Sequence, residues 1–169
     1  ASGRPITADT VYRIYSMSKV IAAVSGLILY EHGQFRMDDP LSRFLPAFKN
    51  PRVYETSPDG GVHTRPASRE ILIRDLFTMG SGIPWIGTAT PAERDMLRLF
   101  RGPKSVAGQL TTVEIAERVA GIPLDFDPGS HWKYGFSMDI LGALVSVLSG
   151  KTFENFIRDE ICAPLGMRD

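Results

Sequence analysis

The longest apolar stretch of the chain lies near its beginning. Residues 18–31 are almost continuously apolar and rich in good helix formers, and the stretch ends at His32-Gly33. Glycine suits the left-handed position just past the end of a helix. The pattern therefore predicts a helix over residues 18–31. Because apolar positions surround its axis, we expect this helix to be buried on nearly all sides and to lie at the centre of the fold.

Most of the remaining signals also predict helices. Polar residues that cap helix N-termini precede several segments, two of them with a glutamate three residues later that can reach back to the cap. These predicted caps are Asp39 (followed by Pro40), Thr90 (with Glu93), Thr111 (with Glu114) and Thr152, which begins a last helix running to about Cys162. A further apolar helix is predicted over residues 138–148, ended by Gly150.

Signals for strands are scarce. Residues 10–15 are β-branched and aromatic and predict a short extended segment. Residues 49–68 are rich in proline, glycine and polar side chains and predict a loop with a turn at 57–61. Two more loops are expected at 80–90 and 101–110. The chain is therefore expected to be a helical subdomain with long loops, which often border functional sites.

Composition excludes several classes of protein. The 169 residues suit one soluble globular domain, with 43% apolar and 22% charged residues. Nineteen basic and nineteen acidic residues give zero net charge, so we expect neither nucleic acid nor membrane as a partner. Three dispersed histidines and one cysteine predict no metal site. No signal peptide or membrane-spanning run is evident, and a lone Cys162 is compatible with a reducing compartment such as the cytoplasm.

Candidate chemistry begins with Ser16 and Lys19, which form a Ser-x-x-Lys motif at the start of the first predicted helix. Residues three apart share one helical face, so the lysine could help the serine lose its proton. Spacing alone favours the plainer interpretation of a helix cap beside a solvated lysine. A second match, Ser130 and Lys133, follows Asp127-Pro-Gly and is better interpreted as a turn.

Two aromatic residues extend this candidate site. Tyr134 lies where a loop leads into the apolar helix, so its phenol can point into a cleft and shuttle a proton, although many tyrosines there only pack. Trp85, in the loop at 80–90, could line an acyl pocket or equally fill a gap in the core. Ser16, Lys19 and Tyr134 together would supply a nucleophile, a lysine that tunes it and a proton carrier.

Five segments along nearly the whole chain carry motifs whose order can be compared with that of known families. They are residues 10–19 (Thr-Val-Tyr-Arg-Ile-Tyr-Ser-Met-Ser-Lys), 37–46, 73–82, 128–134 and 163–167 (Ala-Pro-Leu-Gly-Met). In this order they resemble the class C β-lactamase family, which includes penicillin-binding-protein-like hydrolases and family VIII carboxylesterases. The role of the lysine in Ser-x-x-Lys enzymes is disputed. One departure from the resemblance is Met79, which stands where the family usually has histidine.

The resemblance implies an α/β fold, the β-lactamase/transpeptidase-like fold. The chain would cover mainly the nucleophile helix (about residues 16–32) and the helical subdomain (about 38–169). We expect the family's N-terminal strands and C-terminal sheet strands to be absent, together with its third motif and the second oxyanion donor. An isolated fragment of this kind should be inactive.

The resemblance also implies a mechanism. Ser16 would attack an acyl carbonyl to form an acyl-enzyme, Lys19 and Tyr134 would act as general acid and base, and the Ser16 N–H would stabilise the oxyanion, with no cofactor. Phe136 stands where penicillin-recognising members have asparagine, so we expect hydrolysis of a small carboxylic ester, with Phe136 and Trp85 contacting substrate. A β-lactamase, a D-amino-acid peptidase, an acyltransferase and a catalytically silent penicillin-binding-like module are the alternatives. Oligomeric state is left open.

Overall fold

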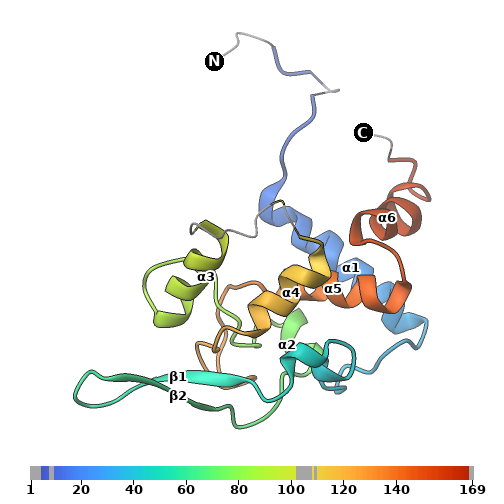
Figure 1. The fold of residues 1–169 in the computed structure, drawn as a ribbon. Coiled ribbons are helices and arrows are strands. Elements are labelled where there is room, and N and C mark those ends of the chain that lie inside the picture. The colour runs from blue at the N-terminus through green and yellow to red at the C-terminus, as the bar shows by residue number, and fades with distance from the viewer. Residues whose placement is uncertain (1–4, 8–9, 102–107, 109, 168–169) are drawn as a thin grey trace.

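The computed structural model describes residues 5–7, 10–101, 108 and 110–167. It is mainly helical, with one small sheet (Figure 1). The elements are α1 (Ser18–Glu31), β1 (Arg52–Thr56), β2 (Val62–Pro66), α2 (Ile73–Phe77), α3 (Pro91–Arg101), α4 (Thr112–Ala120), α5 (Ser137–Ser149) and α6 (Phe153–Ile157). Short 3-10 helices cover Tyr15–Met17, Leu41–Arg43 and Pro46–Phe48, and a π-helical turn covers Arg158–Cys162.

Helix α5 lies at the centre of the fold. It packs against α1, α4, α2 and α6, and its residues 137, 138 and 140–145 are buried. Gly150 ends the helix in the left-handed conformation at φ 68°, as the sequence predicts. The apolar residues of α5 face neighbours on several sides, which explains the continuous hydrophobicity of this segment.

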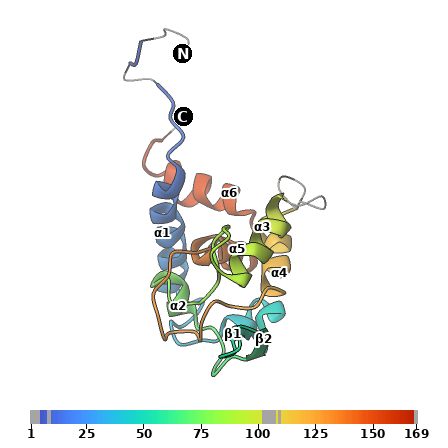
Figure 2. The ribbon, with the colours of Figure 1, turned by 90° about the vertical axis from the view of Figure 1, so that its left-hand side faces the viewer.

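Helix α1 has the predicted bounds, but the expectation that it is buried on nearly all sides at the centre is wrong. Val20, Val24 and Leu27 are 67%, 40% and 42% exposed, whereas Ala22 and Gly26 are buried on the side facing α5. Figure 2 shows α1 along one side of the molecule. A helix that is apolar all round needs neighbours all round, and within the described residues only one side of α1 has them.

The expected loop at 49–68 instead contains a β-hairpin. Strands β1 and β2 pair antiparallel, with Arg52 opposite Pro66 and Thr56 opposite Val62. The predicted turn at 57–61 joins them, closed by hydrogen bonds between Ser57 and Gly60 and between Ser57 and Gly61. Only Val53 of the ten strand residues is buried, so the strands lack the alternating apolar pattern that reveals most strands.

Residues 10–15 form no strand among the described residues, since no neighbouring strand pairs with them. Asp39-Pro40 likewise begins no α-helix, only the 3-10 helix Leu41–Arg43. The Asp39 carboxylate accepts from the Arg36 backbone N–H at 2.8 Å and from the Arg43 guanidinium at 2.9 Å. It is therefore used by the turn before it and by an ion pair, and does not cap a helix.

The other predicted caps are confirmed. The Thr90, Thr111 and Thr152 hydroxyls accept from the backbone N–H groups three residues later, at 3.1, 3.3 and 3.2 Å, which begins α3, α4 and α6. The predicted last helix does reach Cys162, but only α6 is α-helical and its continuation is a π-helical turn. Part of the expected loop at 101–110 lies outside the described residues, and Arg101 is the last residue of α3.

No single helix in the described part of the chain is long and apolar enough to cross a membrane. Taken together, α5 and the segment Phe153–Cys162 reach the length and apolar composition of a membrane span, but they are bent by 80° relative to each other. Across the same residues, no cluster of three or more histidine, cysteine or acidic side chains is arranged to hold a metal ion.

Candidate active site

Ser16 lies in a short turn that leads directly into α1. The 3-10 helix Tyr15–Met17 precedes Ser18, the first residue of α1, so Ser16 and Lys19 lie one turn apart. Tyr15 holds φ at 46°, a conformation that bulky aromatic residues rarely adopt. Such a conformation costs about 1–3 kcal/mol and is concentrated at functional sites. The turn thus presents the exposed Ser16 hydroxyl at the start of the helix.

The structure brings the three predicted residues together, although 118 positions separate Ser16 from Tyr134. The Ser16 Oγ lies 2.5 Å from the Tyr134 hydroxyl. The Lys19 Nζ donates to the Ser16 Oγ at 3.5 Å and lies 4.9 Å from the centre of the Tyr134 ring. A serine hydroxyl therefore has both a phenol and an ammonium group within reach, which is the geometry that nucleophile activation requires.

Backbone hydrogen bonds hold the segment that carries Tyr134. The Lys133 N–H donates to the Met79 carbonyl at 3.1 Å, and the Gly129 N–H donates to the Gly80 carbonyl at 2.8 Å. Met79, where the family usually has histidine, adopts φ 57°, and this bend lets the chain after α2 run beside residues 129–134. The loop at 80–90 and the Tyr134 segment are therefore fixed to each other.

Side-chain contacts that no sequence pattern predicts complete this attachment. The Lys133 ammonium lies 2.6 Å from an Asp125 carboxylate oxygen and 2.8 Å from one of Glu93, and it lowers the pKa of the Glu93 carboxyl. Buried hydroxyls of Ser81 and Ser137 lie 2.8 Å apart. No local motif links these residues, because they come from different parts of the chain. Lys133 is thus a structural anchor, and Ser130 of the alternative Ser-x-x-Lys match donates instead to the Asp127 carbonyl at 2.7 Å, in the predicted turn.

The surroundings of Tyr134 lower the pKa of its phenol. Hydrogen bonding from Lys19, and then from Ser16, lowers the pKa of Tyr134, and the positive charge of Lys19 acts in the same direction. Desolvation by burial opposes this, and so, less strongly, does the charge of Asp139 on the first turn of α5. Solvent reaches Asp139, yet it lies in a hollow, and desolvation there raises the pKa of its carboxyl despite the nearby Lys19. Tyr134 therefore has the environment of a proton acceptor.

Trp85 lies beside Lys19 and Tyr134, and the buried Phe136 packs against Trp85. The Trp85 ring centre is 5.2 Å from that of Tyr134 and 4.9 Å from that of Phe136. The Lys19 ammonium is 5.2 Å from the centre of the Trp85 ring. Trp85 is partly exposed, so it is available to a ligand rather than filling the core. An apolar wall therefore borders the Ser16, Lys19 and Tyr134 cluster.

Comparison with known proteins identifies the family. The Beta-lactamase family model matches residues 1–169. The chain belongs to the Beta-lactamase family. The expected β-lactamase/transpeptidase-like fold is confirmed, and the chain comprises the mainly helical part of it with a small sheet.

The relatives of this Beta-lactamase family chain include esterases and acyltransferases. It is 33% identical to esterase EstB of Burkholderia gladioli over 169 residues, which are 99% of this chain and 40% of the esterase. It is 31% identical to monacolin J acid methylbutanoyltransferase of Aspergillus terreus, covering 98% of this chain and 38% of that enzyme. The structure of EstCE1, a hydrolase with promiscuous acyltransferase activity, matches with a TM-score of 0.76 and 26% identity, covering 98% of this chain and 40% of that one. The chain thus spans about two fifths of the length of these relatives.

Proposed function

We propose that this chain carries the acylation machinery of a serine esterase that cleaves small carboxylic esters. The observation that supports this most directly is the placement of the Ser16 Oγ 2.5 Å from the Tyr134 hydroxyl and 3.5 Å from the Lys19 ammonium. Membership of the Beta-lactamase family and the similarity to an esterase support the same chemistry.

The proposed reaction has two halves. Tyr134, as a phenolate stabilised by Lys19, takes the Ser16 proton while Oγ attacks the ester carbonyl, and it then returns that proton to the departing alcohol. In the second half a water molecule loses its proton to Tyr134, attacks the acyl-enzyme and releases the acid, and Ser16 recovers its proton. Backbone N–H groups in the first turn of a helix lack helical partners, and the Ser16 N–H, in the turn that leads into α1, would stabilise the oxyanion.

The test is covalent labelling of the protein that contains this chain. A fluorophosphonate probe should add once, and peptide mass spectrometry should place it on Ser16. Ser16→Ala should abolish both labelling and hydrolysis of p-nitrophenyl acetate. Labelling of another residue, or full ester hydrolysis by the alanine variant, would contradict the proposal, and an unreactive protein would favour a silent penicillin-binding-like module.

Acyl transfer to an alcohol is a second candidate, favoured by the similarity to the methylbutanoyltransferase and to EstCE1. It uses the same acyl-enzyme, with an alcohol replacing water in the second half. Adding 1-butanol to the ester assay and measuring butyl ester against free acid separates the two: a product that is mostly butyl ester at low alcohol concentration assigns transfer.

A β-lactamase or D-amino-acid peptidase is disfavoured by Phe136. Its buried phenyl ring packs against Trp85 and cannot donate or accept a hydrogen bond to a substrate amide. The protein should therefore hydrolyse p-nitrophenyl acetate far faster than a chromogenic cephalosporin. The reverse ranking would assign the amide-cleaving function.

A further inference from the structure

A cavity of about 240 Å³ lies between α3, α4, α5 and α6, behind the aromatic wall of the candidate site. Six of its eight lining residues are apolar: Phe100, Ile115, Ala116, Phe136, Ile140 and Phe153. By comparison, an apolar cavity of about 150 Å³ in another protein stays dry and binds benzene. This cavity therefore has room for a branched or ring-sized hydrocarbon group.

Two features connect the cavity to the candidate site. Phe136 contacts Trp85 on one side, with ring centres 4.9 Å apart, and Phe100 on the other, at 5.0 Å, so one row of rings runs from beside Lys19 to the cavity. In addition, Asp139 and Phe153 line both this cavity and a hollow of about 160 Å³ that is bordered by Lys19. The cavity thus adjoins the residues that surround Ser16.

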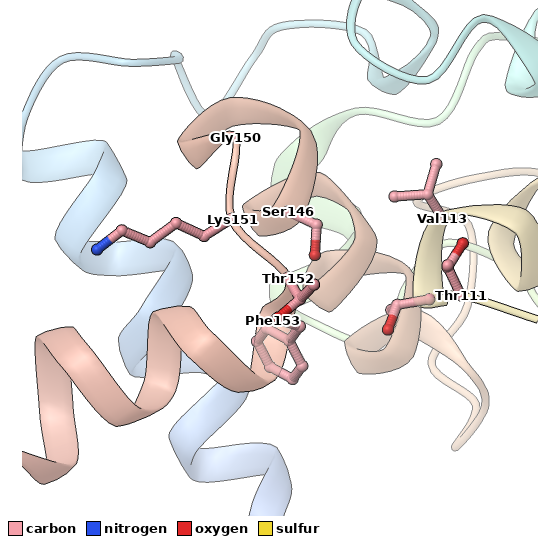
Figure 3. A pocket seen from close by; sticks show the side chains of 8 residues that line it. Thr111, Val113, Ser146, Gly150, Lys151, Thr152 and Phe153 are labelled. Atoms are coloured by element: carbon pink, nitrogen blue, oxygen red, sulfur yellow. The ribbon is translucent and has the colours of Figure 1, made fainter.

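A neighbouring hollow of about 270 Å³ is less suited to a hydrocarbon group. It is lined by Thr111, Thr152, Ser146 and Lys151 among others and borders the first cavity at Phe153 (Figure 3). The Lys151 side chain points away from it, and its ammonium pairs with Asp159 and Glu160. The Thr111 and Thr152 hydroxyls already cap helices. Five of the eight residues that line this hollow have polar side chains, so it suits a hydrocarbon group less well than the first cavity does.

We propose that the cavity receives the acyl chain of the ester and that Ile115, on α4, sets how long that chain can be. This rests on the proposed function, because it requires an acyl group attached to Ser16. The apolar walls select a hydrocarbon chain, and the acidic Asp139 at the edge disfavours a chain that ends in a carboxylate. The substrate class is therefore an ester of an uncharged acid of medium length.

The test compares p-nitrophenyl acetate, butanoate, hexanoate and octanoate. Each methylene that enters an apolar cavity should raise kcat/KM about fourfold until the cavity is full. Ile115→Trp fills the cavity and should lower kcat/KM for the hexanoate at least about tenfold relative to the acetate. Val113→Trp is the matched control: Val113 lies on the same helix but lines the 270 Å³ hollow and a separate hollow beside residues 44–48, so the chain-length profile should not change.

A second variant keeps the test decisive if the tryptophan disturbs folding. Ile115→Ala enlarges the cavity and should move the preferred chain towards the octanoate. If both Ile115 variants keep the wild-type profile, the cavity is not the acyl site. Intact-mass detection of an acyl-enzyme on Ser16 distinguishes failure of this inference from failure of the proposed function. An acyl-enzyme with an unchanged chain-length profile overturns this inference alone. Absence of an acyl-enzyme from every ester overturns the proposed function as well.

Discussion

Gly135 separates Tyr134 from Phe136, and its lack of a side chain controls how closely the Tyr134 segment approaches the loop that carries Trp85. A Cβ built at this position would lie well under 3.0 Å from the Ile83 carbonyl oxygen, closer than real Cβ atoms come to other atoms. It would also come within 3.4 Å of the Pro84 carbonyl carbon. Both obstacles are backbone, so no side-chain rotation can relieve the clash.

Gly135→Ala therefore forces the loop and the Tyr134 segment apart by about 1 Å, and a displacement of that size at a catalytic group can lower the rate about 100-fold. Overpacking of this kind also costs about 1–3 kcal/mol of stability. We expect kcat/KM for p-nitrophenyl acetate to fall about 100-fold, with a lower midpoint in thermal unfolding followed by circular dichroism.

Gly121→Ala is the matched control. Gly121 ends α4 at φ −75°, which alanine adopts readily, and its Cβ would meet only the Arg118 carbonyl oxygen at 3.4 Å. This variant should keep wild-type kcat/KM and stability. If Gly135→Ala were as active as Gly121→Ala, the close approach of the two segments would have no part in positioning Tyr134.

Three further perturbations test separate parts of the structure. Because Lys19 lowers the pKa of Tyr134, Lys19→Gln should raise that pKa and move the limb of kcat/KM that rises with pH to higher pH, whereas Lys19→Arg should move it less; a limb that stays in place in the glutamine variant would remove Lys19 from this role. Arg65 and a backbone N–H hold the pKa of Asp127 well below its usual range, so the carboxylate stabilises the fold above its unfolded pKa of about 3.9 and this stability is lost as pH falls through the folded pKa. Asp127→Asn should therefore lower thermal stability at pH 7 by about 1–3 kcal/mol and flatten its dependence on pH below 4; equal melting curves at pH 7 would contradict this. Gly26→Val should lower the free energy of unfolding by about 1–3 kcal/mol, because a Cβ there would lie within 3.2 Å of the Phe77 ring in α2 and of Leu141 in α5. An unchanged urea midpoint would show that α1 can shift to accommodate the side chain.

Local signals explain what the sequence could predict. The caps at Thr90, Thr111 and Thr152 depend on contacts over three residues, so they are visible in the sequence and present in the structure. Ser16 and Lys19 share a helical turn for the same reason. Tyr134 is identified by its position before an apolar helix and by the order of motifs, since no local rule joins it to Ser16.

Features that depend on tertiary contacts could not be predicted in this way. The Lys133 ion pairs with Glu93 and Asp125 join α3 to the connection between α4 and α5. The contacts of Trp85 follow from the backbone attachment of its loop. The exposure of α1 escapes prediction because an apolar sequence indicates that a surface needs covering, but not which neighbour covers it.

The exposed apolar side of α1 begins next to Ser16, the proposed nucleophile. Val20, Val24 and Leu27 follow Ser16 along one face of the helix, at successive intervals of four, four and three residues. Whatever surface docks on these side chains also arrives within a turn of the nucleophile and forms a wall beside it. A surface that covered this stripe would therefore also border the proposed substrate site. If the protein were divided into this chain and the part that covers the stripe, ester turnover would therefore report reassembly of the two pieces.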